Sequence, residues 1–170
     1  MNGILERWNH LPTSEAADEI LPCCGSRTWA NNLTAHRPFE DVATLLATSD
    51  RIWQGLTAAD WLEAFGSDPR IGETRKPVGA SARSQQWSSQ EQSRAADSPE
   101  AVKQALAEGN RLYERKFQRI FIICATGKSA PEILEALQHR LNNDESAELL
   151  EAAEQQRQII HIRIHKWLTE

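Results

Sequence analysis

The feature that most constrains the fold is the spacing of the apolar residues, which recur every three or four positions through most of the chain. The clearest case is the segment that begins at Ser98-Pro99 and stops at Gly127. Its apolar residues lie mostly four apart, on one face of a helix; they are Val102, Leu106, Tyr113, Phe117, Ile120, Phe121 and Cys124. We therefore predict one long buried helix here, with its apolar end at the centre of the core.

The same spacing and the usual capping residues predict helices through most of the remaining chain. No alternating strand pattern stands out apart from Ile159–Ile162. We expect an all-α fold, a compact bundle of about seven or eight helices, in a single domain over residues 1–170. The other expected helices run through residues 15–21, 26–36, 39–53, 57–65, from 88 onward, 129–141 and 145–168.

The least regular part of the sequence is residues 66–87, which hold several glycines, prolines and serines and little apolar content. Gly66 can end the preceding helix, and Pro69 prevents the helix from resuming at once. We expect a long irregular loop that lines a cleft and carries the charged residues Asp68 and Arg70. The alternative is an ordinary solvated loop between helices.

Charge and composition narrow the classes of partner. The net charge is −5 and the pI about 5.6, which argues against nucleic acid and acidic membrane surfaces as partners. The longest apolar run has six residues, and the N-terminus shows no signal-peptide pattern. Three cysteines without metal-like spacing indicate buried, reduced thiols, so we expect a cytoplasmic protein.

Two histidines four apart, His161 and His165, resemble the spacing of zinc ligands on a helix. A metalloprotease helix would carry Glu at position 162, where this chain has Ile162. No cysteine or carboxylate cluster supplies a third ligand at a characteristic spacing, so we expect no metal site.

Two further groups of polar residues admit both a structural and a functional interpretation. Ser88 and Glu91 fit a capping box, while Glu91 and Gln92 at a helix start could hold a urea-like ligand. Arg163 lies among isoleucines on the last helix, so it needs a partner or an exit to water. The residues alone leave these alternatives open.

Several motifs occur in the order seen in one family: Cys23-Cys24-Gly25-Ser26-Arg27-x-Trp29-Ala30, Arg37-Pro38-Phe39, Asp60-Trp61-Leu62-Glu63-Ala64-Phe65, Pro69-Arg70-Ile71-Gly72, Ser88-x-x-Glu91-Gln92 and Phe121-x-x-Cys124-Ala125-Thr126-Gly127-Lys128. Over residues 5 to 168 the chain resembles 2-oxo-4-hydroxy-4-carboxy-5-ureidoimidazoline (OHCU) decarboxylase, which completes urate breakdown to (S)-allantoin. The resemblance implies an all-α homodimer that needs no cofactor and acts on a ureido-imidazoline.

The resemblance also implies site residues. Those matching the family's substrate pocket are Pro69, Ser88, Glu91, Gln92 and Arg163, with Ala30 and the backbone from Ile122 to Cys124 also expected to line it. The family has His at the position of Asp68, and that His is usually given the central catalytic role.

Asp68 and Glu91 are therefore the candidate catalytic residues, and the Asp at position 68 predicts weak or absent turnover. The competing hypotheses are a catalytically silent module that binds a ureido-imidazole ligand, and a helical interaction protein without a pocket.

Overall fold

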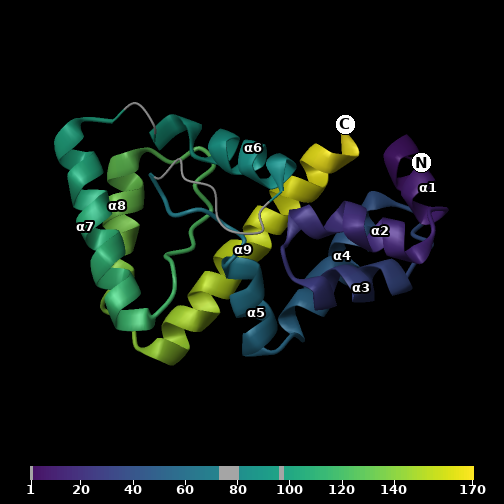
Figure 1. Ribbon diagram of the computed structural model, residues 1–170, viewed down its shortest axis with the longest axis horizontal. Coiled ribbons are helices and arrows are strands. Elements are labelled where there is room, and N and C mark those ends of the chain that lie inside the picture. The colour runs from purple at the N-terminus through teal and green to yellow at the C-terminus, as the bar shows by residue number, and fades with distance from the viewer. Residues whose placement is uncertain (1, 73–80, 96–97) are drawn as a thin grey trace. The chain divides into compact units, whose positions relative to one another are not determined.

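The computed structural model describes residues 2–72, 81–95 and 98–170, and all regular structure in these residues is helical. Nine α-helices, α1 to α9, and two short 3-10 turns make up the regular structure of the described residues, which include no strand; Figure 1 labels the helices. The prediction of an all-α fold is confirmed. The chain forms two compact units, called unit 1 (Met1–Ala64 and Arg157–Glu170) and unit 2 (Phe65–Gln156). The single domain over residues 1–170 stays a prediction.

Unit 1 holds the N-terminal helices and the last part of the C-terminal helix. Each of three helices begins at a side chain that accepts a backbone N–H of the first turn: Asn2 for α1, Ser26 for α3 and Asp41 for α4. The Asn2 amide also donates to the Leu168 carbonyl at 3.0 Å, which ties the first helix to the last. The helices are α1 (Gly3–Asn9), α2 (Thr13–Ile20), α3 (Arg27–Ala35), α4 (Val42–Gln54), α5 (Ala58–Phe65) and the end of α9 (Glu145–Leu168), with a 3-10 turn at Leu21–Cys23.

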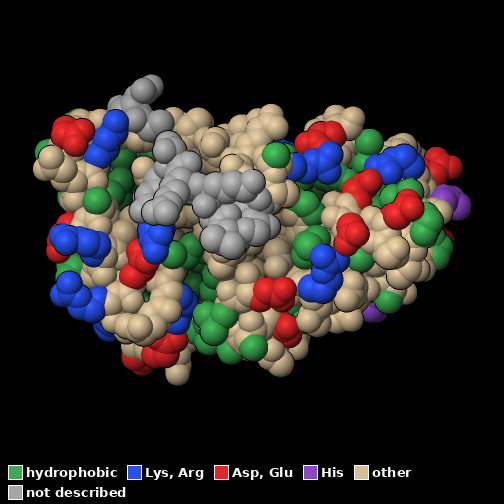
Figure 2. All heavy atoms as spheres, in the orientation of Figure 1, with side chains coloured by type: hydrophobic (Ala, Val, Ile, Leu, Met, Phe, Trp, Pro, Cys, Tyr) green, Lys and Arg blue, Asp and Glu red, His purple; other side chains and the backbone are tan. Residues whose placement is uncertain are grey.

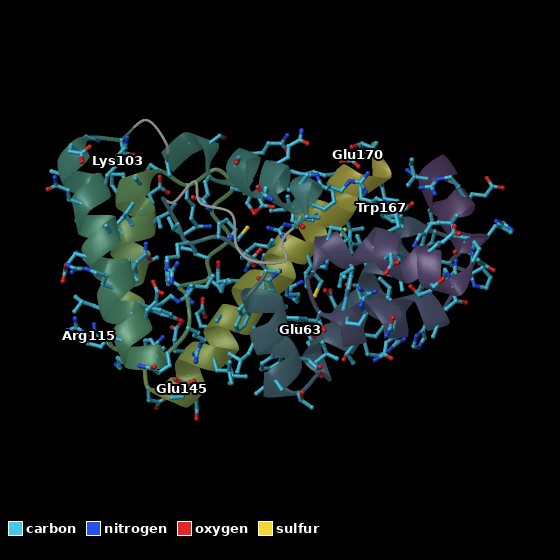
Figure 3. All side chains as sticks on the ribbon, viewed as in Figure 1. Glu63, Lys103, Arg115, Glu145, Trp167 and Glu170 are labelled. Carbon is cyan, nitrogen blue, oxygen red and sulfur yellow. The ribbon has the colours of Figure 1, made fainter. Side chains whose placement is uncertain are left out.

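Tryptophans dominate the core of unit 1. Four are fully buried: Trp8, Trp29, Trp53 and Trp167. Trp167, labelled in Figure 3, meets the Trp8 ring edge-on at 5.6 Å between centroids. Buried indole N–H groups also find acceptors, because Trp8 donates to the Ala16 carbonyl and Trp29 to the Ser49 hydroxyl. The buried indole N–H groups of Trp8 and Trp29 are therefore paired inside an interior made mostly of apolar side chains.

Unit 2 contains α6 (Ala82–Glu91), a 3-10 turn (Ser93–Ala95), α7 (Glu100–Phe117), α8 (Ala130–Arg140) and the first part of α9. Figure 1 shows α7 and α8 side by side, and Gly109 of α7 lies against Leu137 of α8. A Cβ at Gly109 would lie 2.5 Å from Leu137 Cδ2, closer than carbon atoms can approach. The missing side chain is thus what lets the two helices pack.

The core of unit 2 combines residues of α7 and α8 with two non-helical segments. Ile71 comes from the segment after α5, and Phe121, Ile123 and Ala125 come from the segment between α7 and α8. These side chains pack with Leu106, Tyr113, Phe117, Ala130, Ile133 and Leu137. The prediction that Ile120–Ala125 belongs to the core is correct in its burial.

The predicted helical conformation of that segment is wrong, because α7 ends at Phe117. Gln118 takes the left-handed conformation with φ of 59°, and its N–H bonds the Glu114 carbonyl as a helix C-cap. The chain then crosses the core without a helix as far as Ser129, where the predicted capping box with Glu132 opens α8.

Two other boundaries differ from the sequence prediction. Helix α6 begins at Ala82, capped by the Ser81 hydroxyl, so the expected loop over 66–87 is wrong for residues 82–87. Residues 73–80 of that loop lie outside the described residues. The short helix α1 has no counterpart among the expected helices.

Acidic and basic side chains are interspersed on the face shown in Figure 2, where the coloured atoms show no broad area of one sign. This arrangement agrees with the modest net charge. Within the described part of the chain, none of the helices has the length and hydropathy needed to cross a bilayer.

Candidate functional site

The segment Asp68–Gly72 follows α5 directly and is held from both ends. The Asp68 N–H donates to the Phe65 carbonyl at 3.1 Å, and the Asp68 residue is only 8% exposed. The Ile71 carbonyl accepts from the Asn110 amide of α7 at 3.0 Å in a buried contact. The loop that carries the first candidate catalytic residue is therefore fixed to α7 through its backbone.

A charged contact adds a second anchor from α7, one turn after Asn110. Arg70 donates from Nε to both carboxylate oxygens of Glu114 at 2.9 Å, and from Nη2 to Oε1 at 2.7 Å. Nε and Nη2 of Arg70 thus both face the Glu114 carboxylate, which is the bidentate geometry of a strong charged contact.

Ser88 and Glu91 lie in the last turn of α6 and are both buried. The capping-box interpretation of these two residues is wrong, since the cap of α6 is Ser81 and the helix ends at Glu91. The expected position at a positive helix start is wrong for the same reason, because a helix C-terminus carries the negative end of the dipole. Burial, rather than capping, is what these two side chains share.

Gln92 connects the end of α6 to the Asp68–Gly72 segment. Its Oε1 accepts the Gly72 N–H at 3.0 Å. This bond fixes which way the amide faces, because only the carbonyl oxygen of a Gln side chain can accept an N–H. The Nε2 donor makes no hydrogen bond within the described residues and is therefore the group that Gln92 can offer to a ligand.

Ile122 and Cys124 lie in the non-helical segment between α7 and α8, where side chains satisfy their backbone groups. Arg140 Nη1 donates to the Ile122 carbonyl at 2.6 Å, and Gln155 Oε1 accepts the Cys124 N–H at 2.9 Å. Lys128 Nζ donates to the Cys124 carbonyl at 2.5 Å.

Arg140 is part of a sealed ionic group in unit 2. Its guanidinium contacts Glu148 through Nη2 at 2.5 Å and through Nε at 3.1 Å, and Glu148 has no exposed area. The Tyr113 hydroxyl donates to the same carboxylate at 2.5 Å. Burial and then the Glu148 contact raise the pKa of Tyr113 far above its ordinary value, so the phenol stays a neutral donor.

The remaining two candidates belong to unit 1. Ala30 is fully buried in α3, and Arg163 in α9 is only 2% exposed. The alternative that Arg163 reaches water is wrong, because its side chain is enclosed. The seven other candidates lie in unit 2: Asp68, Pro69, Ser88, Glu91, Gln92, Ile122 and Cys124.

Of the two histidines singled out as possible metal ligands, His161 is partly buried and His165 is exposed. His161 Nε2 lies 2.7 Å from Asp50 Oδ1 of α4, beside an Arg157–Asp50 contact of 3.5 Å. Among the residues that the structure describes, no group of three or more His, Cys, Asp or Glu side chains is placed to hold a metal ion.

Sequence reasoning missed the anchoring residues Asn110, Glu114, Arg140 and Gln155. One of them carried a readable signal: Arg140 continues the apolar spacing of Ile133 and Leu137 on α8, and a charge on an apolar stripe requires a buried partner. Asn110 and Gln155 anchor backbone groups of loops distant in sequence, and Glu114 pairs with the Arg70 side chain, and no spacing rule reveals these contacts.

Comparison with known proteins assigns the chain to a family. A family model described as OHCU decarboxylase matches residues 9–165. The uric acid degradation bifunctional protein TTL of Arabidopsis thaliana is 35% identical over 153 residues, which are 90% of this chain but 47% of that protein. The chain thus spans about half the length of this curated relative.

Solved structures agree with this assignment. A crystal structure of an OHCU decarboxylase in the presence of (S)-allantoin has a TM-score of 0.77 and 36% identity, covering 90% of this chain and 99% of that one. The structure of an (S)-allantoin synthase shares the fold alone, with a TM-score of 0.70 and 16% identity over 96% of this chain and 53% of that one. The chain belongs to the OHCU decarboxylase family.

Proposed function

We propose that this protein decarboxylates 2-oxo-4-hydroxy-4-carboxy-5-ureidoimidazoline to (S)-allantoin, acting as a carbon–carbon lyase. The observation that carries the proposal is the family match over residues 9–165, together with the full-length similarity to a decarboxylase crystallised with (S)-allantoin. The geometry of unit 2 supports it, because the loop from Asp68 and the end of α6 are joined through Gln92.

The substrate supplies its own electron acceptor. Its carboxylate sits on a ring carbon that also bears a hydroxyl, next to a C=N carbon. When the C–C bond to the carboxylate breaks, CO2 leaves and the bonding pair forms a C=C bond while the C=N pair moves to nitrogen, which takes a proton. Protonation of the ureido-bearing carbon on one face, with loss of the hydroxyl proton, then gives the carbonyl of (S)-allantoin.

The protein must therefore orient the substrate and handle protons, rather than store electrons. In this proposal Arg163 holds an anionic or carbonyl oxygen through its planar fork. Glu91 accepts ureido N–H groups, and Gln92 donates from Nε2, since its oxygen is engaged with Gly72. The family resemblance adds Ser88, Pro69, Ala30 and the Ile122–Cys124 backbone as further residues that contact the substrate in this proposal.

Position 68 decides how fast the reaction runs. A histidine has an ordinary pKa of about 6.5 and transfers protons near neutral pH, whereas aspartate, at about 3.9, is ionised there. A carboxylate at this position also repels the substrate carboxylate. We therefore propose that the chain turns over weakly or not at all while it still binds (S)-allantoin. A silent binding module is the second candidate function, and Asp68 is the observation that favours it.

The test is stopped-flow kinetics on enzymatically generated substrate with the wild-type chain and Asp68→His. We expect Asp68→His to raise the rate by roughly 10²-fold or more, the usual scale of a positioned general acid–base. An ordinary enzymatic rate in the wild type would make Glu91 the leading proton carrier. Binding of (S)-allantoin with no turnover in either chain would favour the silent module.

Assembly and compartment are also proposals that follow from the family. We propose a cytosolic homodimer; the three cysteines are buried thiols outside any disulfide, and Leu112 and Leu150 expose apolar surface in unit 2. Sedimentation at micromolar concentration tests the assembly, and a monomer would contradict it.

A further inference from the structure

Two side chains from different helices hold the peptide groups on either side of Ile123. On the N-terminal side, Arg140 of α8 donates to the Ile122 carbonyl at 2.6 Å. On the C-terminal side, Gln155 of α9 accepts the Cys124 N–H at 2.9 Å. All of these residues belong to unit 2, so the arrangement is internal to one compact unit.

The Arg140 contact is set by a buried ionic group rather than by a flexible side chain. Nη2 and Nε of Arg140 are engaged by Glu148, which also accepts from Tyr113 and from Asn143 Nδ2 at 3.2 Å. The Arg140 guanidinium further stacks on Phe121, with Cζ 4.4 Å from the ring centroid. With the guanidinium plane fixed in this way, Nη1 is left with a single direction, toward the Ile122 carbonyl.

A sealed ion pair is weak evidence for stability, because the cost of removing two charges from water offsets much of their attraction. Such groups are better explained by what their geometry specifies. Here the specified atom is a carbonyl oxygen in a segment that has no helical hydrogen bonds of its own.

The Gln155 contact is oriented by a second side chain. Gln155 Nε2 donates to Glu151 Oε1 at 3.1 Å, one turn earlier on α9. A carboxylate only accepts, so the Gln155 amide must turn its nitrogen toward Glu151 and its oxygen toward Cys124. This amide is therefore held in one orientation, and its oxygen has a defined role.

Because peptide groups are planar, these two contacts also determine the directions of the Ile123 N–H and C=O. The C=O and N–H of a trans peptide point in opposite directions, and the cis peptide found in the described chain is elsewhere, at Arg37-Pro38. The Ile123 N–H therefore points away from Arg140, and the Ile123 C=O points away from Gln155. Neither group makes a hydrogen bond within the described residues.

We propose that Arg140 and Gln155 are positioning residues, which aim the main-chain N–H and C=O of Ile123 at the ligand. This inference rests on the proposed function. A neighbouring donor and acceptor on one residue match an amide-like edge, such as a ureido group or the lactam of a ring, which presents a C=O beside an N–H. Glu148, held by Tyr113, orients Arg140, and Glu151 orients Gln155.

The sharpest test is at Gln155, which is partly exposed and therefore tolerates substitution. Gln155→Leu removes the acceptor, and the exchanged pair Glu151→Gln/Gln155→Glu restores it, since a carboxylate can accept both from Cys124 and from the new amide. Gln138→Leu, on an exposed turn of α8, is the matched control. (S)-Allantoin binding is measured by calorimetry, and amide exchange at Cys124 by NMR in the absence of ligand.

We expect Gln155→Leu to weaken (S)-allantoin binding by roughly 10-fold, the scale of one lost hydrogen-bonded contact, and to speed exchange at Cys124. In the Asp68→His background the same change raises KM and leaves kcat nearly unaltered, because the ground state and transition state lose the same contact. The exchanged pair returns binding to within about 3-fold, given that its acceptor is restored. Gln138→Leu leaves both readouts unchanged.

Wild-type binding in Gln155→Leu would overturn the inference and leave the proposed function standing. A fall in kcat at constant KM, unrescued by the exchanged pair, would show a merely structural role and would overturn it too. If neither the wild type nor Asp68→His binds (S)-allantoin, the proposed function fails, and the ligand part of the inference fails with it. Unchanged exchange at Cys124 in Gln155→Leu would separately disprove the anchoring.

Discussion

Units 1 and 2 are both helical, but they differ in the polar groups that are buried in their interiors. In unit 1 the buried indole N–H groups of Trp8 and Trp29 bond to neighbouring acceptors, Arg163 is buried in α9, and the Arg7–Glu19 ion pair is partly exposed. In unit 2 a complete ion pair, Arg140–Glu148, is sealed in the interior. The difference follows from local structure, because unit 2 brings non-helical backbone into its core and must satisfy that backbone with side chains.

This contrast coincides with the distribution of the candidate site. Seven of the nine candidate residues lie in unit 2, on or beside its non-helical segments. Helices satisfy their own backbone, whereas loops leave peptide groups available for side chains and ligands. The candidate residues of unit 2 thus lie where side chains, rather than helical hydrogen bonds, satisfy the backbone.

The largest expected effect comes from breaking the sealed ion pair. Glu148→Leu leaves the Arg140 guanidinium and the Tyr113 hydroxyl without their acceptor, so we expect the free energy of unfolding to fall by about 3–5 kcal/mol. Urea denaturation measures this loss. The double variant Arg140→Met/Glu148→Leu is the control and should recover much of it, because no charge is then left buried. Equal losses in the single and double variants would contradict the role of the unpaired charge.

The helix contact at Gly109 gives the next effect. Gly109→Ala places a Cβ 2.5 Å from Leu137 Cδ2 and forces α7 and α8 apart, with an expected loss of about 1–3 kcal/mol. The matched control in unit 1 is Gly3→Ala, since a Cβ at Gly3 meets no atom within 4 Å. That control should stabilise α1 by up to about 1 kcal/mol. Thermal unfolding compares the two, and losses of similar size would show that close packing is not special to unit 2.

Helix caps should contribute similarly to the stability of the two units. They therefore test whether the difference between the units is limited to their interiors. Ser129→Ala removes the capping box of α8 and should cost about 1 kcal/mol, and Asp41→Ala should cost a similar amount at α4. Both are read from urea denaturation at neutral pH. A cap worth several times more in one unit would mean that the contrast includes helix ends as well as interiors.

The same caps predict a dependence on pH. The Ser129 hydroxyl and then its N–H lower the pKa of Glu132, and the Thr44 N–H lowers the pKa of Asp41. A carboxyl with a depressed folded pKa stabilises above its unfolded value, about 4 for these groups, and loses that contribution as pH falls through the folded value. The difference between wild type and Ser129→Ala should therefore shrink in acid, and a difference that grows would contradict the assigned cause.

The smallest expected effect is at the surface of unit 1. Arg7→Gln breaks a bidentate contact with Glu19, at 3.0 and 2.6 Å, in which the arginine side chain is 48% exposed. We expect a loss of at most about 1 kcal/mol, reduced further by salt, because water screens exposed charges. A loss comparable to that of Glu148→Leu would abolish the proposed contrast between exposed and sealed ion pairs.

The sequence predicted most of the helices because their spacing and caps are local properties. It placed Ile120–Ala125 correctly in the core but wrongly in a helix. The stop at Gln118 depends on a left-handed residue that is not glycine, and sequence rules look for glycine there. The error matters for the site, since this segment exposes peptide groups only because it is not helical.

The candidate site was predictable to the extent that it depends on side-chain chemistry. The sequence placed Glu91 beside Gln92, and the structure adds that the Gln92 oxygen is engaged by Gly72, twenty residues earlier. The structure also shows that Ser88 does not cap α6, because the cap is Ser81, seven residues upstream. Such long-range and competing local contacts are decided by packing, which spacing alone does not encode.

The sealed Arg140–Glu148 pair also has a thermal consequence. The free energy needed to strip water from charged groups falls as temperature rises, while stabilisation by apolar burial levels off. Warming therefore favours the contact that holds the Ile122 carbonyl relative to the tryptophan packing of unit 1. Heat should therefore loosen the aromatic cluster around Trp8 before it loosens the ion pair that holds the Ile122 carbonyl. The Ile122–Cys124 segment should then keep its conformation closer to the melting temperature than the core of unit 1 does.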